Sequence, residues 1–94
     1  MPVVARHLSI CGKVQGVSYR DWTLDTATEL GLAGWVRNRM DGSVEAFVQG
    51  EPAVIDAFVM HAHEGPPAAR VARIETEDAA FDADITGFDR RTTV

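Results

Sequence analysis

Residues 12–20 constrain this chain more than any other stretch, because they join an alternating apolar segment to a helix-like segment. Two glycines and a serine let the backbone curl, and an arginine closes the curl where the helix begins. A loop of this shape points several backbone N–H groups inward and forms a nest for an anion. The stretch reads Gly12-Lys13-Val14-Gln15-Gly16-Val17-Ser18-Tyr19-Arg20.

Arg20 is the most informative residue of this stretch. A cation in the first turn of a helix opposes the helix dipole, so the placement is mildly unfavourable by itself. An anion bound between Arg20 and the loop amides would reverse the sign of that interaction. We therefore hypothesise a phosphate-sized anion site at this loop.

The size and charge of the chain limit the classes of protein to which it can belong. Its 94 residues suit one domain, which we expect to span residues 1–94 and to bury roughly two thirds of its unfolded surface. A net charge of −5 argues against a general binder of nucleic acid or of a membrane surface, since such binders need a basic face. With Cys11 as the single cysteine, no disulfide can form within these residues, and we expect a reducing, cytoplasmic location.

No targeting or membrane segment is expected. Residues 1–6 lack the long apolar core of a signal peptide. No stretch of the chain approaches the ~18 consecutive apolar residues that a membrane-spanning helix needs.

Hydrophobic periodicity predicts seven elements in a β-α-β-β-α-β order followed by one further strand. The first strand places Leu8, Ile10 and Val14 on one face, and Gly31 is expected to cap the C-terminus of the first helix. Apolar residues without clean alternation in the fourth strand indicate a bulge, and the last strand is expected at an edge. The predicted strands are residues 4–14, 32–39, 43–49, 69–77 and 85–91, and the predicted helices are residues 20–30 and 52–63.

The turn between the second and third strands can be chosen from the faces of the strands. A three-residue loop, residues 40–42 with Gly42 left-handed, places Val36 opposite Ala46 and keeps the apolar side chains on one face. A two-residue loop would place Val36 opposite Phe47 and split the apolar set. The three-residue loop is therefore predicted.

The element order predicts an α+β fold, in which two right-handed split β-α-β units form an antiparallel sheet with both helices on one face. The crossover makes the first two strands parallel, so their carboxyl ends lie at the same edge of the sheet. Asn38 lies near the end of the second strand, on the helix side, and should come close to the loop at residues 15–20. A polar side chain on an otherwise apolar face needs a reason to be there.

Three motifs of this chain resemble those of the acylphosphatase family. Residues 12–20 resemble the first family signature, residues 34–45 resemble the second, and residues 65–71 match a weaker pattern after the second helix. The likeness covers nearly the whole chain, from about Ala5 to Phe88. It implies a ferredoxin-like βαββαβ sandwich and an enzyme that hydrolyses the carboxyl-phosphate bond of acyl phosphates without a metal or another cofactor.

The resemblance also implies roles for individual residues. Arg20 corresponds to the arginine that binds the substrate phosphate, and Asn38 to the asparagine that orients the attacking water. Backbone amides of the loop complete the phosphate site. The phosphate-binding set is Gln15, Gly16, Val17, Ser18, Tyr19 and Arg20, and no metal ligand is expected.

Two departures from the family pattern are visible. Ser18 stands where glycine is common in the family, which would stiffen the loop or add a hydroxyl contact. Residues 88–91 match the usual terminal strand poorly. We expect a monomer that binds a small acyl phosphate, releases inorganic phosphate and is inhibited by it.

Other classes of function compete with this one. A non-catalytic module that binds phosphate or acyl phosphate remains an alternative, because this fold hosts many regulatory domains. An RNA-binding domain of the same topology needs exposed aromatic side chains on its first and third strands and a basic sheet. The first strand has His7, Ser9 and Cys11 instead, so this class is not expected unless salt-sensitive RNA binding is observed. His61 and His63 lie two residues apart on a helix and do not face each other, so surface histidines are expected rather than a metal site. A solvated face is expected for Glu75, Glu77, Asp78, Asp82 and Asp84.

Overall fold

The computed structural model describes residues 3–94 and contains every predicted element. The ends of the elements differ from the predicted ends by at most three residues, and the starts of the first strand and the second helix coincide with the predicted ones. Residues 1 and 2, the start of the stretch expected not to be a signal peptide, lie outside the described part. No helix within residues 3–94 has the length and apolar character to cross a membrane. The elements are β1 (Val4–Lys13), α1 (Tyr19–Glu29), β2 (Ala33–Asn38), β3 (Val44–Gly50), α2 (Pro52–Ala62), β4 (Arg70–Ala79) and β5 (Phe88–Arg90).

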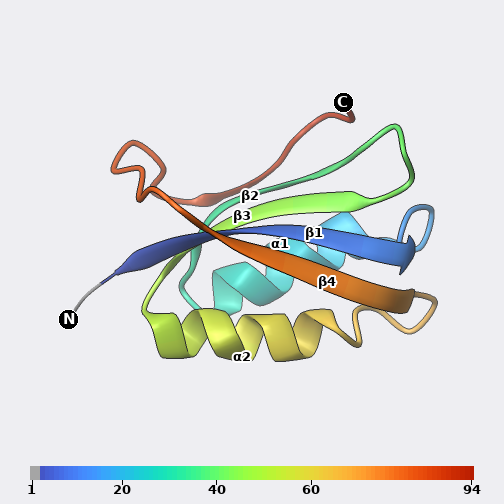
Figure 1. Ribbon diagram of the computed structural model, residues 1–94, viewed down its shortest axis with the longest axis horizontal. Helices are drawn as coiled ribbons and strands as arrows, with labels where there is room; N and C mark the ends of the chain where they lie inside the picture. Colours follow the sequence, from blue (N-terminus) through green and yellow to red (C-terminus); the bar gives the residue numbers. More distant parts are fainter. Residues whose placement is uncertain (1–2) are drawn as a thin grey trace.

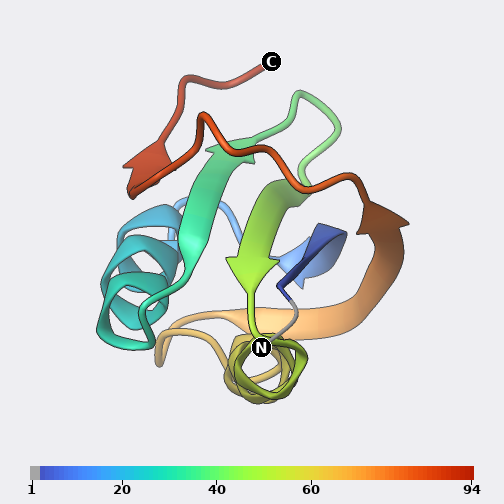
Figure 2. The ribbon, with the colours of Figure 1, turned by 90° about the vertical axis from the view of Figure 1, so that its left-hand side faces the viewer.

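The five strands form one sheet in the order β4-β1-β3-β2-β5, and both helices cover one face of it (Figures 1 and 2). Four strands pair antiparallel, as predicted. The fifth pairs parallel with β2, so the complete sheet is mixed rather than antiparallel. The reason is the connection at residues 80–87, which crosses from β4 at one edge of the sheet to β5 at the other (Figure 2). The predicted strand at residues 85–91 shortens to Phe88–Arg90.

The core lies between the sheet and the helices. The predicted inner face of the first strand is fully buried, with Leu8 and Ile10 of β1 at 0% exposure and Val14, the residue after β1, at 1%. The apolar faces of β2, β3 and α2 complete the core, as their patterns predicted. These side chains are Val36, Val44, Ala46, Val48, Ile55, Phe58 and Ala62.

Two turns form at the glycines that predicted them. Gly31 has a φ of 74° and ends α1, where the N–H of Leu32 donates to the carbonyl of Ala27. Gly42 has a φ of 93° in the three-residue loop of the β2–β3 hairpin. Val36 pairs with Ala46, which confirms the predicted register.

Gly12 has a different role from the one expected. It belongs to β1, opposite the predicted bulge, where the register of β1 and β4 shifts by one residue. Its φ is 128°, and a Cβ atom there would lie 2.3 Å from the carbonyl oxygen of Arg70. Gly12 therefore allows a close approach of two strands, and the curl of the loop depends on Gly16 and Ser18 instead.

Candidate active site

The loop between β1 and α1 lines a pocket. Gly16 and Ser18 have positive φ values of 73° and 65°, and Ser18 is the one non-glycine residue with positive φ among residues 3–94. The first N–H to bond within α1 is that of Trp22, which donates to the carbonyl of Ser18. No backbone carbonyl within residues 3–94 accepts from the amides of residues 16–20. The loop therefore carries a run of unused donors at a helix N-terminus.

Tyr19 attaches the loop to the end of α2. Its side chain is 1% exposed, and its hydroxyl donates to the carbonyl of Ala62 at 2.6 Å. Burial raises the pKa of the Tyr19 phenol well above its ordinary value, so it remains a donor at any physiological pH. Gly65 (φ 64°) makes room for the ring, because a Cβ atom there would lie 2.6 Å from Tyr19 Cε2. Gly65, from the weaker third motif, therefore follows the end of α2 and also leaves the space that the Tyr19 ring occupies.

Gln15 ties the loop to the β2–β3 hairpin. Its side-chain Nε2 donates to the carbonyl of Arg39 at 2.7 Å and to the carbonyl of Ser43 at 2.8 Å. Both acceptors lie beside Asn38 or its pairing partner Val44. The Gln15 side chain is consequently committed to the protein, and its backbone is the part that remains for a ligand.

A pocket of about 260 Å³ lies between the loop and the end of β2. It brings together five of the six predicted phosphate-binding residues and Asn38. Val17 does not line the pocket; its side chain packs against the core. The lining residues are Val14, Gln15, Gly16, Ser18, Tyr19, Arg20, Asp21, Asn38 and Arg90.

Arg20 and Asn38 keep their side-chain hydrogen-bonding capacity for the pocket. Within residues 3–94, the half-buried Arg20 has no carboxylate within salt-bridge distance, and the side-chain amide of Asn38 forms no hydrogen bond. The backbone of Asn38 is held on both sides, by β3 at Val44 and by the N–H of Val94, which donates to the Asn38 carbonyl. A fixed backbone with an unsatisfied side chain is the arrangement expected of a ligand-binding residue.

Sequence reasoning missed Arg90 and Asp21. Arg90 lies on β5 beside Val36, and its Nη1 forms a salt bridge of 2.7 Å with Asp21 Oδ1 at the start of α1. Both side chains remain largely exposed, at 46% and 60%. The sequence carried no signal for this pair, because the parallel pairing of β5 could not be read from its short and irregular pattern.

The opposite face of the sheet carries a second group of arginines, around Glu45. Arg37 Nε lies 2.5 Å and Arg39 Nη2 3.0 Å from the Glu45 carboxylate, which also contacts His7. Burial raises the pKa of Glu45, but hydrogen bonds from Arg39, Arg37 and His7 outweigh it and lower this pKa to about 2. Strand alternation sends Arg37 and Arg39 to this face and Asn38 to the pocket.

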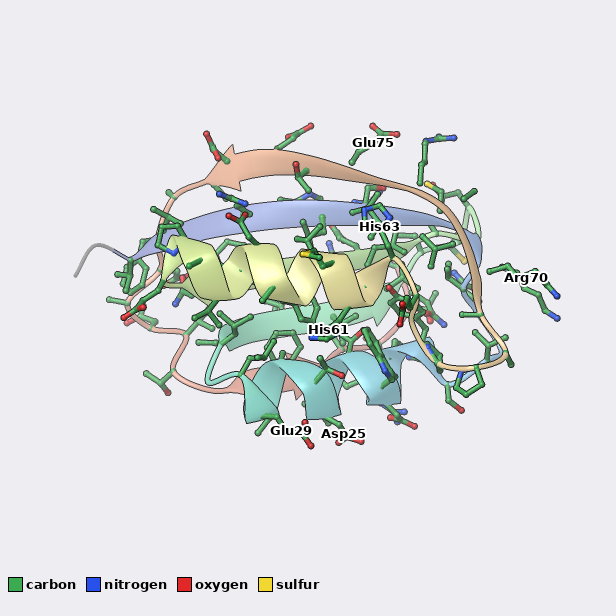
Figure 3. The ribbon with its side chains drawn as sticks, turned by 90° about the horizontal axis from the view of Figure 1, so that it is seen from below. Asp25, Glu29, His61, His63, Arg70 and Glu75 are labelled. Carbon is green, nitrogen blue, oxygen red and sulfur yellow. The ribbon has the colours of Figure 1, made fainter. Side chains whose placement is uncertain are left out.

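The remaining titratable side chains form no comparable site. Figure 3 shows His61 directed toward the space between the helices and His63 on the other side of α2. Asp25 and Glu29 point away from the body of the protein in the same view. Across residues 3–94, no group of three or more His, Cys, Asp or Glu side chains is placed to hold a metal ion. The five acidic residues expected on a solvated face are all exposed.

Comparisons with known proteins agree with the resemblance seen in the motifs. A family model described as acylphosphatase matches residues 6–90. The acylphosphatase of Acidovorax sp. (strain JS42) is 50% identical over 91 residues, which cover 97% of this chain and 93% of the relative. That of Azoarcus sp. (strain BH72) is 55% identical over 87 residues, covering 93% and 88%. The crystal structure of acylphosphatase from Bacillus subtilis superposes with a TM-score of 0.89 at 30% identity, over 94% of this chain and 98% of that one.

Proposed function

The chain belongs to the acylphosphatase family and is a hydrolase of acyl phosphates, and we propose that the pocket between the β1–α1 loop and Asn38 carries out this reaction. The observation that supports the proposal is the set of unused donors in that pocket. Arg20 has no carboxylate partner, and the loop amides have no backbone acceptor within residues 3–94. Such donors suit a group that brings its own negative charge.

The phosphoryl group binds in the loop. Its non-bridging oxygens accept from the backbone N–H groups at residues 15–19 and from the forked guanidinium of Arg20. The helix dipole of α1 adds a favourable interaction with the dianion. Because Tyr19 and Gln15 hold the loop in place, the donors need little reorganisation when charge develops in the transition state.

Asn38 holds the attacking water. Its side-chain amide can both accept from and donate to a water molecule, so it can orient the water without titrating. The water oxygen forms a bond to phosphorus as the bond from phosphorus to the bridging oxygen breaks, and the electron pair leaves with the carboxylate. A carboxylate is a good leaving group, so little general-acid assistance is needed.

The water must also lose a proton. Asp21 is the one carboxylate in the lining of the pocket among the described residues, and it is paired with Arg90. We therefore assign the proton to a phosphoryl oxygen of the substrate. The products are then a carboxylate and dihydrogen phosphate, which together carry the two negative charges of the substrate.

The test is hydrolysis of benzoyl phosphate in excess EDTA by the wild type and by Arg20→Ala and Asn38→Ala. We expect wild-type turnover without added metal. We expect losses in kcat of about 10³–10⁵ for Arg20→Ala, as for other arginines that stabilise phosphoryl transfer. For Asn38→Ala, which removes one positioning group, we expect about 10²–10³.

Arg73→Ala is the matched control, because Arg73 forms an exposed salt bridge with Glu75 on β4 and does not line the pocket. It should turn over like the wild type. Normal turnover by either pocket variant would refute the role assigned to that residue. A requirement for Mg²⁺ would refute the metal-free mechanism.

The alternative, a non-catalytic phosphate-binding module, is not favoured by relatives that are acylphosphatases along most of their length. Three finer properties remain proposals: competitive inhibition by inorganic phosphate, which would occupy the same loop, action as a monomer, and a cytoplasmic location. Phosphate inhibition kinetics and sedimentation equilibrium test the first two. Localisation of the tagged chain in cells tests the third.

A further inference from the structure

The salt bridge between Arg90 and Asp21 lies at the rim of the pocket and has no part in the mechanism above. Its two side chains are 46% and 60% exposed, whereas Val14 and Tyr19 in the same lining are each 1% exposed. A phosphoryl group seated on the loop amides directs its acyl half away from the floor of the pocket. The rim is therefore where the acyl half of the substrate lies.

The backbone places Arg90 at this rim independently of Asp21. In β5, Arg90 is the neighbour of Val36 on β2, two residues before Asn38. The next residue, Arg91, points to the opposite face, where its guanidinium lies 4.8 Å from the ring centroid of Trp35. The N–H of Arg91 also donates to the carbonyl of Val36 at 2.8 Å. The backbone of β5 is thus hydrogen-bonded to β2 next to Arg90. The position of Arg90 at the rim therefore does not depend on its salt bridge with Asp21, and its long side chain can reach an anion.

The charges at the rim fit an anionic partner. Arg90 uses one of its five donors on Asp21, so several remain. A salt bridge this exposed contributes little to stability, and its partners are easily shared with a ligand. Arg20 and the loop amides already serve the phosphoryl oxygens, so a second guanidinium is in excess of what that group needs.

We propose that Arg90 is a specificity-determining residue that favours acyl phosphates whose acyl half carries a second negative charge, such as a distal carboxylate. This proposal rests on the proposed function of the pocket and names its preferred class of substrate. Asp21 opposes the preference, because it competes with the substrate carboxylate for Arg90.

The test compares succinyl phosphate with butyryl phosphate, which has a methyl group in place of the distal carboxylate. The measured quantity is the ratio of kcat/KM for succinyl phosphate to kcat/KM for butyryl phosphate. We expect Arg90→Gln to lower this ratio about fivefold, the effect that a half-exposed ion pair supports. We expect Asp21→Asn to raise it, because the competing carboxylate is gone.

The opposite signs distinguish recognition of substrate from a structural role, since both variants break the same salt bridge. Arg73→Gln removes an equal charge from a salt bridge outside the pocket lining and should leave the ratio unchanged. A ratio that stays within about twofold of the wild type in Arg90→Gln, or that moves the same way in both variants, would overturn the proposal. Failure of the proposed function would look different, because Arg20→Ala would then still hydrolyse butyryl phosphate.

Discussion

Arginines gather in two places in this molecule, on opposite faces of the sheet. On the face away from the helices, Arg37 and Arg39 surround the buried carboxylate of Glu45. On the helix side, Arg20 borders a pocket and has no carboxylate partner within residues 3–94. Each arginine of the first group has a carboxylate partner, whereas Arg20 leaves its donors unused. Unmet hydrogen-bonding capacity, rather than the number of arginines, distinguishes the candidate binding site from the structural network.

The largest expected effects are a loss of activity from a substitution at Arg20 and a loss of stability from a substitution at Glu45. Arg20→Ala should lose about 10³–10⁵ in kcat while its free energy of unfolding stays within about 1 kcal/mol of the wild type. Glu45→Gln should lose about 2–4 kcal/mol of stability, because it leaves Arg37 and Arg39 without their partner charge. Urea unfolding measures the free energy of unfolding of each variant, and turnover at saturating benzoyl phosphate measures its kcat. If folded Glu45→Gln has a severely reduced kcat, the salt bridges around Glu45 also affect catalysis, and the proposed division between the two faces is wrong.

The second-largest effect should be a loss of stability at low pH, caused by protonation of Glu45. The pKa of Glu45 is lowered from 4.5 to about 2 in the folded protein, so its contribution is complete above about pH 4.5 and is lost as the pH falls toward 2. At 1.36 kcal/mol per pKa unit, the loss is at most about 3–4 kcal/mol. Urea titrations between pH 7 and 2.5 measure it. Glu45→Gln should show a shallower decline over the same range, and an equal decline would contradict the assignment.

Tyr19→Phe tests whether the pocket depends on its anchor. The substitution leaves the carbonyl of Ala62 without its donor, so we expect a loss of about 1–2 kcal/mol in the free energy of unfolding. We also expect kcat/KM to fall about tenfold, because a loosened loop positions its amides less well. A drop in stability with unchanged kcat/KM would mean that the loop holds its shape without the hydroxyl.

The smallest effect should come from Ser18, the one residue of the loop held in a left-handed conformation against its preference. Ser18→Gly removes strain of about 1–2 kcal/mol but adds chain entropy to the unfolded state, so the net gain should stay below about 1 kcal/mol. Ser18→Val should destabilise instead, because a branched side chain fits this conformation poorly. Thermal unfolding of both variants measures the difference, and stabilisation by valine would contradict the conformational account.

Much of the fold and part of the site could be predicted from local patterns. Alternation identified the buried face of β1, and Gly42 with the apolar faces selected the hairpin register that turns Asn38 toward the helices. The crossover then brought Asn38 and Arg20 to one pocket. These inferences succeeded because periodicity and backbone sterics act over a few residues, and because the handedness of a crossover depends on the chirality of the chain.

Other features depend on contacts between segments far apart in sequence, and only the tertiary structure decided them. Gly12 and Gly65 looked like turn glycines, yet each makes room for another segment, Arg70 in β4 or the ring of Tyr19. Arg90 reaches the pocket because a long connection returns β5 to the far edge of the sheet, parallel to β2. The sequence alone therefore determined the order of the elements and the residues that form the loop, whereas the packing of distant segments decided how that loop is held and brought Arg90 to the rim of the pocket.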